Sequence, residues 1–451
     1  MQTSSQHDLL LNALASGAKT ARELAGALWV SQPTVSRRIA ELGARTARLG
    51  KGRATRYALL REIQGAGSHF PLCRITPEGN PESLGTLLAL TRNQFWWEAT
   101  GKDGELFDSL PWFIQDMRPD GFMGRAFAHR NGSDLGLPED PKNWTDDQTL
   151  LALSSCGDDC PGDLIIGAKA LHRYRDRSLY ETAAIEESSC ADHYPQLAES
   201  ALSGEAPGSS AGGEQPKFPV LLSGTGGLRH ALVKFSPPCD TEAGRRWGDL
   251  LLCEHLALEV IRKRGIAAAQ TRLVDGGGRI FLESTRFDRA GRQGRLAVVS
   301  LGCVDDEFVG KRRDWIGTAA ELARQGLLCL EDAGRIRWLH SFGRLIANTD
   351  MHFGNLSLFL VDGRRRFALA PAYDMLPMRY RPQGAEVRPA SFKVPPAHEL
   401  AMAEWEDALP WAERFWNEAA RDERISPPFR QICADNARLL RMHLEGPRIF
   451  S

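Results

Sequence analysis

The segment RIRWLHSFGRLIANTDMHFGNLSLFL, residues 335–360, decides the fold. Leu339, Phe342 and Ile346 recur at helical spacing, so this segment begins as an amphipathic helix. The helical pattern ends at Asn348, because Asn and the Thr that follows it favour turns. A short apolar run, LSLFL, is then typical of a strand. We therefore predict a helix, a polar loop and a strand in that order.

Three polar side chains, Asp350, His352 and Asn355, lie on the predicted loop. After a turn, the segment RFALAPAYDML, residues 366–376, places Asp374 on a second loop. An Asp and an Asn five residues apart, followed after one hairpin by another Asp, are typical of kinases. There the first Asp accepts the proton of the substrate hydroxyl or orients that hydroxyl, and the other two residues bind Mg²⁺. Each Asp alone is more simply a turn cap, but the three together favour phosphoryl transfer.

A glycine-rich segment, SSAGGEQPKF, lies upstream at residues 209–218. Gly212 and Gly213 would let backbone N–H groups approach phosphate oxygens closely, and Lys217 could add a positive charge. The segment is not a Walker A loop, because G-x4-G-K-[ST] occurs nowhere in the chain. Taken alone, it is explained as well by a plain flexible loop.

The segment RHALVKFSPP, residues 229–238, predicts a strand that carries Lys234. Kinases need such a lysine to neutralise the α- and β-phosphates, and a glutamate on a helix to hold the lysine in place. The helix expected over residues 249–266 offers Glu254, and Glu259 is a competing candidate.

At these positions the sequence resembles the HipA family of bacterial serine/threonine kinases, the toxins of toxin–antitoxin modules. The resemblance spans most of residues 95–445. It implies an α+β fold with two lobes, an α/β N-lobe and a mainly helical C-lobe. The D-x-H-x-x-N motif with the later YD is specific to this family. The motifs that carry the resemblance are SSAGGEQPKF, LVKF, the helix from Glu254 to Ile266, LESTRFDR, NTDMHFGNLS and LAPAYDML.

The resemblance also implies roles for individual residues. Asp350 is the expected catalytic residue, Asn355 and Asp374 are the expected Mg²⁺ ligands, and ATP is the expected cofactor. Glu283 in LESTRFDR is expected near the adenine hinge. The expected cofactor-binding residues are Gly212, Gly213, Lys217, Lys234, Glu254, Glu283 and His352.

Members of this family can autophosphorylate a serine in the glycine-rich loop, which silences the kinase. Ser210, and after it Ser209, are the matching candidates. The loop here carries one residue more than the usual family loop, with Pro216 before the lysine. This departure bears on the phosphate contacts and on the identity of the modified serine.

Residues 1–61 form a basic head on an acidic body. They hold ten Lys and Arg against three Asp and Glu, a net charge of +7, so the remainder carries −8. Thr20 with Glu23 three residues later is a capping box, which predicts the start of a helix. Ser31 can cap a further helix over residues 32–42. Another helix around Leu9–Leu14 and two short strands within residues 44–60 complete the head.

A helix-turn-helix followed by a basic hairpin is typical of a winged helix-turn-helix domain that binds DNA. The third helix would enter the major groove, and the hairpin would contact phosphates. The alternative is a packing module with solvated arginines. Within the HipA family, a fused head of this kind resembles the YjjJ-like branch. The candidate DNA-binding residues are Gln32, Thr34, Ser36, Arg37, Arg38, Lys51 and Arg53.

The 451-residue chain has an ordinary soluble composition. Nine scattered cysteines without a secretory signal predict reduced thiols in a cytoplasmic protein. No apolar run reaches the roughly 18 residues of a membrane span. Cys156 and Cys160 lack the two further ligands that a zinc site needs. The aromatic residues Trp96, Trp97, Trp112 and Phe113 are expected to belong to a core.

We predict a winged helix-turn-helix domain at 1–62, an N-lobe at 63–285 and a helical C-lobe at 286–451. The expected function is an ATP-dependent protein serine/threonine kinase of toxin–antitoxin type, autophosphorylating and autoregulated through its own DNA-binding domain. Expected partners are DNA and a protein substrate, such as a translation factor or an aminoacyl-tRNA synthetase. An antitoxin chain is a further candidate, and no membrane partner is expected. Two alternatives stay open: a nucleotide-sensing transcription regulator, and a metal-dependent nuclease.

Overall fold

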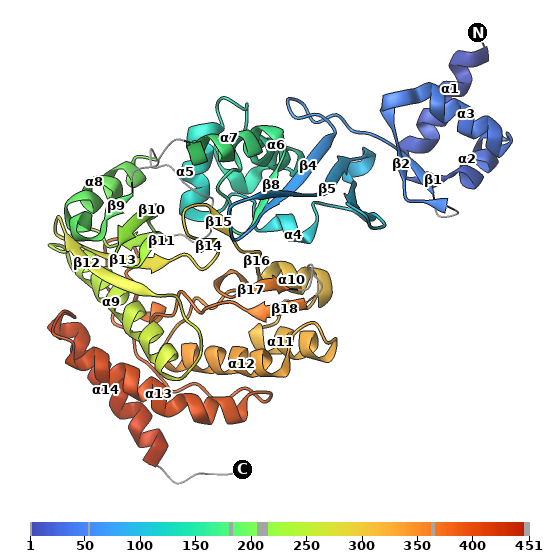
Figure 1. Cartoon of the computed structure of the whole chain (residues 1–451). Coiled ribbons are helices and arrows are strands. Elements are labelled where there is room, and N and C mark those ends of the chain that lie inside the picture. Colours follow the sequence, from blue (N-terminus) through green and yellow to red (C-terminus); the bar gives the residue numbers. More distant parts are fainter. Residues whose placement is uncertain (1, 53–54, 180–183, 205–214, 362–365, 446–451) are drawn as a thin grey trace.

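A computed structural model of the chain describes residues 2–52, 55–179, 184–204, 215–361 and 366–445, and side chains from residue 7 onward with those of 177–179 excepted. Figure 1 shows a small N-terminal head at one end, a middle part beside it, and a larger body that ends in two long helices. Within the described ranges, no helix is both long enough and apolar enough to cross a membrane. All nine cysteines are free thiols.

The head combines three helices with a three-stranded sheet of order β1-β3-β2. Buried leucines of the first two helices pack against Val35 and Ile39 of the third. The predicted capping box is present, because Thr20 and Glu23 bond each other's backbone and side chain. The elements are α1 (Gln2–Ala15), β1 (Lys19–Thr20), α2 (Ala21–Leu28), α3 (Gln32–Leu42), β2 (Thr46–Leu49) and β3 (Arg56–Leu59).

The middle part is built on a five-stranded antiparallel sheet of order β7-β6-β5-β4-β8. Its strands are β4 (His69–Ile75), β5 (Pro81–Ala89), β6 (Phe95–Ala99), β7 (Glu105–Phe107) and β8 (Leu164–Ile166). Its helices are α4 (Trp112–Gln115), α5 (Gly121–Asn131), α6 (Asp146–Cys156) and α7 (Ala168–Leu179). The four aromatic residues expected in a core are partly buried and pack on three separate clusters. Trp97 and Phe113 pack on the core of this sheet, Trp96 on the cluster shared with the head, and Trp112 on the core of the C-terminal part. Phe113 packs edge-on against Trp97 and Trp112.

A second five-stranded sheet, of order β12-β13-β11-β10-β9, lies between α8 (Cys190–Leu202) and α9 (Glu242–Lys263). Figure 1 shows this sheet in green and yellow. Its core is aromatic, with Phe218, Phe235 and Phe281 in mutual contact. The strands are β9 (Ile185–Glu186), β10 (Lys217–Gly224), β11 (Gly227–Phe235), β12 (Thr271–Gly276) and β13 (Arg279–Thr285).

The C-terminal part is mainly helical, as predicted, and carries one small antiparallel sheet of order β16-β17-β18. Its core joins Trp315, Phe342 and Trp416. The strands are β16 (Val298–Ser300), β17 (Ser357–Val361) and β18 (Arg366–Leu369). The helices are α10 (Leu301–Phe308), α11 (Trp315–Arg324), α12 (Leu330–Leu345), α13 (Met402–Arg421) and α14 (Pro427–Glu445). Helix α12, the loop after it and β17 form the helix–loop–strand unit predicted from residues 335–360.

The head is fixed to the middle part by Arg61. Its guanidinium bonds Asp147 at 2.6 and 3.1 Å and lies over the ring of Phe95. The same side chain donates to the Leu90 carbonyl, while its backbone N–H donates to Ala89. A shared apolar cluster of β2, β3 and β5 residues lies beneath these contacts. The head therefore sits on the middle sheet through a packed interface.

Candidate active site

Lys234 on β11 is the centre of the site. Its side chain is buried, with 9% exposure, and its Nζ lies 2.7 and 2.9 Å from the two carboxylate oxygens of Glu254 on α9. The same Nζ contacts Oδ1 of Asp374. A buried ammonium is costly unless it is paired, and here two carboxylates from different parts of the fold meet it. The structure thus brings together three of the predicted residues.

Glu254, and not the competing Glu259, reaches the lysine. The two glutamates are five residues apart on α9, so they face different sides of the helix. Glu259 instead pairs with Arg262 on the same helix, at 3.3 Å. The sequence left this choice open, and the packing of α9 on the sheet settles it.

The loop after α12 is organised by Asn348, a buried residue that the sequence analysis treated only as a helix end. Its Oδ1 accepts the backbone N–H of Asp350 at 3.1 Å, and its Nδ2 donates to the carbonyl of Asp374 at 3.1 Å. Asn355 closes the other end of the loop by donating from Nδ2 to the Asp350 carbonyl at 2.7 Å. Asp350 is therefore held through its own backbone from both sides.

A tyrosine joins the two loops. The hydroxyl of Tyr373 donates to the Gly354 carbonyl at 2.7 Å and lies 2.7 Å from the Ser357 hydroxyl. The residue before Asp374 is thereby tied to the residue before Asn355. The YD pair of the motif, residues 373 and 374, is the sequence signal for this contact.

Two residues of the site adopt the left-handed backbone region without being glycine. Ala347 has a φ of 60° and Asp374 a φ of 55°. Such a conformation costs a non-glycine residue roughly 1–3 kcal/mol, so it persists only where surrounding contacts enforce it. Conformations of this kind are common at functional sites. The bonds of Asn348 to both loops supply that enforcement.

His352 is exposed, and its ring serves the loop itself. Nδ1 accepts the N–H of Gly354 at 3.1 Å and so caps the short turn that carries Asn355. The carbonyl of His352 accepts Nε1 of Trp315 at 3.2 Å. These contacts make His352 a support of the loop geometry.

Glu283 lies on the face of the sheet opposite to Lys234. It stands beside Val233 in the register, whereas Lys234 stands beside Leu282, and successive strand residues point to opposite faces. Its carboxylate is fully buried and accepts Tyr194 at 2.6 Å, Arg229 at 2.6 Å and Arg272. Burial raises the pKa of the Glu283 carboxyl, but these hydrogen bonds more than offset it and leave that pKa below its usual value. Glu283 therefore bonds Tyr194 and two arginines on one face of the sheet, while Lys234 lies on the other face.

Part of the predicted site lies outside the described residues. Gly212, Gly213, Ser209 and Ser210 fall in the segment that the structure leaves undescribed, and so does Arg53 of the head. Lys217 is described: it is buried and stands directly opposite Lys234 in the β10–β11 pair, so both lysines face the same side of the sheet.

The oxygen donors of the two loops suit a magnesium ion. Asn355 directs its amide N–H to the Asp350 carbonyl, which turns its Oδ1 the other way, and Asp374 offers a carboxylate from the adjoining loop. Mg²⁺ is held by few protein oxygens together with phosphate and water. In the described part of the chain, no cluster of three or more His, Cys, Asp and Glu could hold a metal by itself. Cys160, one of the two cysteines considered for a zinc site, is a buried free thiol.

A buried lysine–glutamate pair on one lobe, facing Asp and Asn side chains on two loops of another, defines a kinase-like class of protein. The comparisons with known proteins make this more specific. Residues 66–175 match the family model of the YjjJ-like toxin middle domain, and residues 209–438 match the HipA-like C-terminal domain. The chain is 40% identical to the toxin YjjJ of Escherichia coli strain K12 over 432 residues, 95% of each chain. The chain belongs to the HipA family, in its YjjJ-like branch.

One solved structure has a similar fold over most of the chain. The HipA protein in a complex of Shewanella oneidensis HipA, HipB and operator DNA aligns with a TM-score of 0.53. The alignment covers 83% of this chain and 96% of that one at 16% identity, so the likeness concerns the fold. The Helicobacter pylori proinflammatory kinase CtkA aligns more weakly, with a TM-score of 0.34 over 49% of this chain and 90% of that one, at 12% identity.

Proposed function

We propose that this protein is an ATP-dependent protein serine/threonine kinase that acts as a toxin in the cytoplasm. The observation that carries the proposal is the buried Lys234, which meets Glu254 and Asp374 at one point. An ion pair that only stabilised the fold would need Lys234 and Glu254 alone. It would not need the carboxylate of Asp374, nor the bonds of Asn348 that join the loops of Asp350 and Asp374. The curated relative is a toxin by name, which supports the biological role.

Each residue takes a role set by its position. Mg²⁺–ATP, when bound, supplies the phosphoryl group. Lys234, oriented by Glu254, would contact the phosphates, and Asn355 and Asp374 would hold the metal. Asp350 would receive the proton of the attacking hydroxyl. Its backbone is held by Asn348 on one side and by Asn355 on the other. Asn348 and Tyr373 keep the two loops in register.

The test is incubation of purified protein with Mg²⁺ and ATP, followed by intact-mass and peptide mass spectrometry. The wild type is expected to gain phosphate on Ser210 or Ser209, and Asp350→Asn is expected to gain none. Asp435→Asn, which changes an exposed carboxylate on α14, is the matched control and should behave as wild type. Phosphatase-treated protein that binds ATP but gains no phosphate would favour the nucleotide-sensing regulator. Protein that neither binds ATP nor gains phosphate would contradict the kinase and raise the nuclease.

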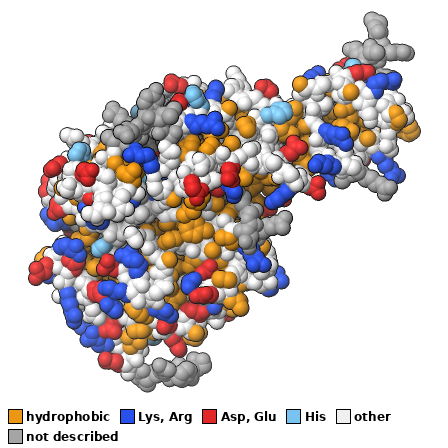
Figure 2. Space-filling model, in the orientation of Figure 1, with side chains coloured by type: hydrophobic (Ala, Val, Ile, Leu, Met, Phe, Trp, Pro, Cys, Tyr) orange, Lys and Arg blue, Asp and Glu red, His pale blue; other side chains and the backbone are white. Residues whose placement is uncertain are grey.

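We further propose that the head is a winged helix-turn-helix domain that binds DNA. On α3, Gln32, Ser36 and Arg37 are exposed, while Val35 and Ile39 are buried in the head. Ser31 caps this helix by accepting the N–H of Thr34 at 3.4 Å. The hairpin of β2 and β3 presents Lys51 at its tip, with Arg48 and Arg56 exposed along it. Basic side chains are spread over the visible face of the head in Figure 2.

DNA binding is tested by the salt dependence of affinity for a duplex of about thirty base pairs, chosen to exceed two turns of major groove. Arg37→Ala and Lys51→Ala, in the full chain, are each expected to weaken binding and to lower the salt slope by about 1. Arg324→Ala, on the exposed face of α11, is the control and should leave the slope unchanged. Equal slopes for all four proteins would contradict a DNA-binding role for these two residues.

The domain limits follow from these roles. We propose a DNA-binding domain at 1–62, an N-terminal catalytic region at 63–285 and a helical C-lobe at 286–451. The region 63–285 holds two separate five-stranded sheets, each with its own core. An antitoxin chain and a protein substrate of the translation machinery are the partners that this proposal expects, with autoregulation through the head.

A further inference from the structure

Residues 286–295 join the two lobes, and this segment carries three buried arginine side chains. We name it the interlobe connector. It follows β13 and contains the short hairpin of β14 (Arg289–Ala290) and β15 (Gly294–Arg295) before the chain reaches β16. The side chains of Arg286 and Arg289 are 5% and 3% exposed, and Arg295 is 4% exposed. Burying a charge is costly unless it is paired and hydrogen-bonded, so these three buried guanidinium groups need partners.

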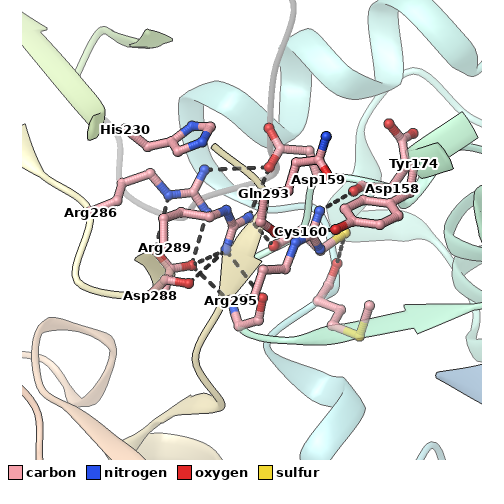
Figure 3. A network of polar contacts seen from close by, with 12 residues as sticks. Asp158, Asp159, Cys160, Tyr174, His230, Arg286, Asp288, Arg289, Gln293 and Arg295 are labelled. Atoms are coloured by element: carbon pink, nitrogen blue, oxygen red, sulfur yellow. Dashed lines mark hydrogen bonds and ion pairs between the residues drawn. The ribbon is translucent and has the colours of Figure 1, made fainter. Parts of the chain in front are cut away.

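The partner is the loop at residues 157–163, which follows α6 of the middle part. Asp159 accepts Nη2 of Arg289 at 2.8 Å and lies 3.6 Å from Nη1 of Arg286. Arg289 also donates to the carbonyls of Cys160 at 2.8 Å and Gly162 at 3.1 Å. Figure 3 shows the arginines of the connector converging on this loop.

The connector contributes one carboxylate to the same network. Asp288 bonds Arg286 at 3.0 and 2.9 Å and Arg289 at 2.7 Å, and it accepts the backbone N–H of Gly162 at 3.0 Å. Arg295 donates to the carbonyl of Asp158 at 2.5 Å. The connector therefore bonds the loop near both of its ends, at Asp158 and at Gly162.

Asp159 is needed for the charge balance. The carboxylates of Asp159 and Asp288 pair with the guanidinium groups of Arg286 and Arg289, while the Asp158 carboxylate is bonded to Arg173 on α7 at 2.9 Å. Burial lowers the pKa of Arg295 to about 10, with the charge of Arg289 adding to the effect. Burial opposes ionisation of Asp159, but the nearby arginines outweigh it and hold its pKa well below the usual value. Without the charge of Asp159, the guanidinium groups of Arg286 and Arg289 would repel each other while sharing the carboxylate of Asp288.

The connector in turn touches both halves of the candidate active site. Its N-terminal end continues β13, which pairs with β11 opposite Lys234, and the N–H of Arg286 donates to His230 of β11 at 2.9 Å. Phe287 packs on the ring of Tyr373, with centroids 5.7 Å apart, directly before Asp374. A change in the connector therefore moves the lysine side relative to the metal-ligand side.

We propose that the middle part positions the two lobes, and that Asp159 is a positioning residue for nucleotide binding. This rests on the proposed kinase function, because it assumes that ATP binds between the lobes. Asp159 acts through Arg286 and Arg289, which fix the connector in one conformation. The middle domain thereby gains a role in the reaction.

The experiment compares the affinity of full-length variants for ATP with Mg²⁺ by isothermal titration. Asp159→Asn, which removes the charge, is expected to raise the Kd for ATP about tenfold, which corresponds to about 1.4 kcal/mol of binding free energy. Asp159→Glu, which keeps the charge, should stay within about threefold of wild type. In the phosphorylation assay, Asp159→Asn should raise the KM for ATP more than it lowers kcat.

Arg118→Gln separates positioning from a general loss of stability. Arg118 pairs with Asp146 at 2.5 Å, and the Asp146 side chain is 24% exposed, like that of Asp159. The Arg118 guanidinium also donates to the Trp144 carbonyl at 2.9 Å, so both of these partners lie in the middle part. This variant should lower Tm and leave the Kd for ATP unchanged. Arg289→Lys, a milder change that keeps the charge but loses the fork of hydrogen bonds, serves if Asp159→Asn does not fold, and should also raise the Kd.

The outcomes are distinguishable. A folded Asp159→Asn or Arg289→Lys variant that binds ATP as tightly as wild type would overturn the inference and leave the kinase proposal standing. An Arg118→Gln variant that weakens ATP binding as much as Asp159→Asn would also overturn it, because stability alone would then explain the effect. A wild type that binds no ATP would overturn the proposed function itself.

Discussion

At the scale of single residues, Trp29 is an unusual choice at the end of α2. It has a φ of 55°, a conformation that favours glycine, and its side chain is 94% exposed. We expect Trp29→Gly to raise the free energy of unfolding by about 0.5–1 kcal/mol, the left-handed strain less the entropy cost of glycine. Urea denaturation measures this. Trp29→Ala keeps the strain, so a glycine variant no more stable than the alanine variant would count against this reading.

His340 on α12 predicts a dependence of stability on pH. Burial lowers its pKa from 6.5 to about 4, with Arg344 and His398 adding to the effect and Asp314 opposing it. Between these pH values the unfolded chain binds a proton that the folded chain does not, so stability falls as pH decreases from 6.5 to 4. The slope is at most about 1.4 kcal/mol per pH unit.

His340→Phe is expected to flatten this part of the stability curve while retaining a ring against Trp315. Denaturation midpoints at half-unit pH steps provide the measurement. An unchanged slope in the variant would assign the acid sensitivity to other groups.

At the scale of elements, Asp305 at the end of α10 holds the connection to α11. Its carboxylate is fully buried and accepts the backbone N–H groups of Lys311 at 3.1 Å and Arg312 at 2.8 Å, and the Thr318 hydroxyl. Arg312, with a φ of 43°, lies over the ring of Phe353 in the candidate catalytic loop.

We expect Asp305→Ala to destabilise the protein by about 3 kcal/mol, because the buried Thr318 hydroxyl and two backbone N–H groups lose their acceptor. Thermal denaturation tests this against Asp306→Ala, whose ion pair with Arg312 is more than half exposed and should contribute less than about 1 kcal/mol. Similar losses for the two variants would show that the buried carboxylate has no special role.

At the scale of the whole molecule, Arg61 couples the head to the middle part. We expect Arg61→Ala to leave both parts folded and to loosen their interface, because it removes the ion pair with Asp147 and the contact with Phe95. Hydrogen exchange should then accelerate for peptides that cover residues 56–63 and 86–92. Arg74→Ala, which breaks an exposed pair within the middle sheet, is the control. Unchanged exchange at the interface would mean that the apolar cluster alone holds the head.

The sequence predicted most local structure, because each local feature had a local cause. The capping box at Thr20, the end of α12 near Asn348 and the strand that carries Lys234 all depend on residues close in sequence. The same reasoning could not place Glu283, since the face of a strand on which a side chain lies depends on the register with its neighbours.

The family, the order of the motifs and the residue types of the candidate site follow from the amino-acid sequence. Tertiary packing selects the glutamate that reaches Lys234, the face that carries Glu283 and the arginine partners of Asp159. The physical reason is that burial and charge pairing act between residues far apart in the chain. Asp159 and Arg289 are 130 positions apart in the chain, yet Oδ1 of Asp159 lies 2.8 Å from Nη2 of Arg289. No local sequence pattern indicates such a contact.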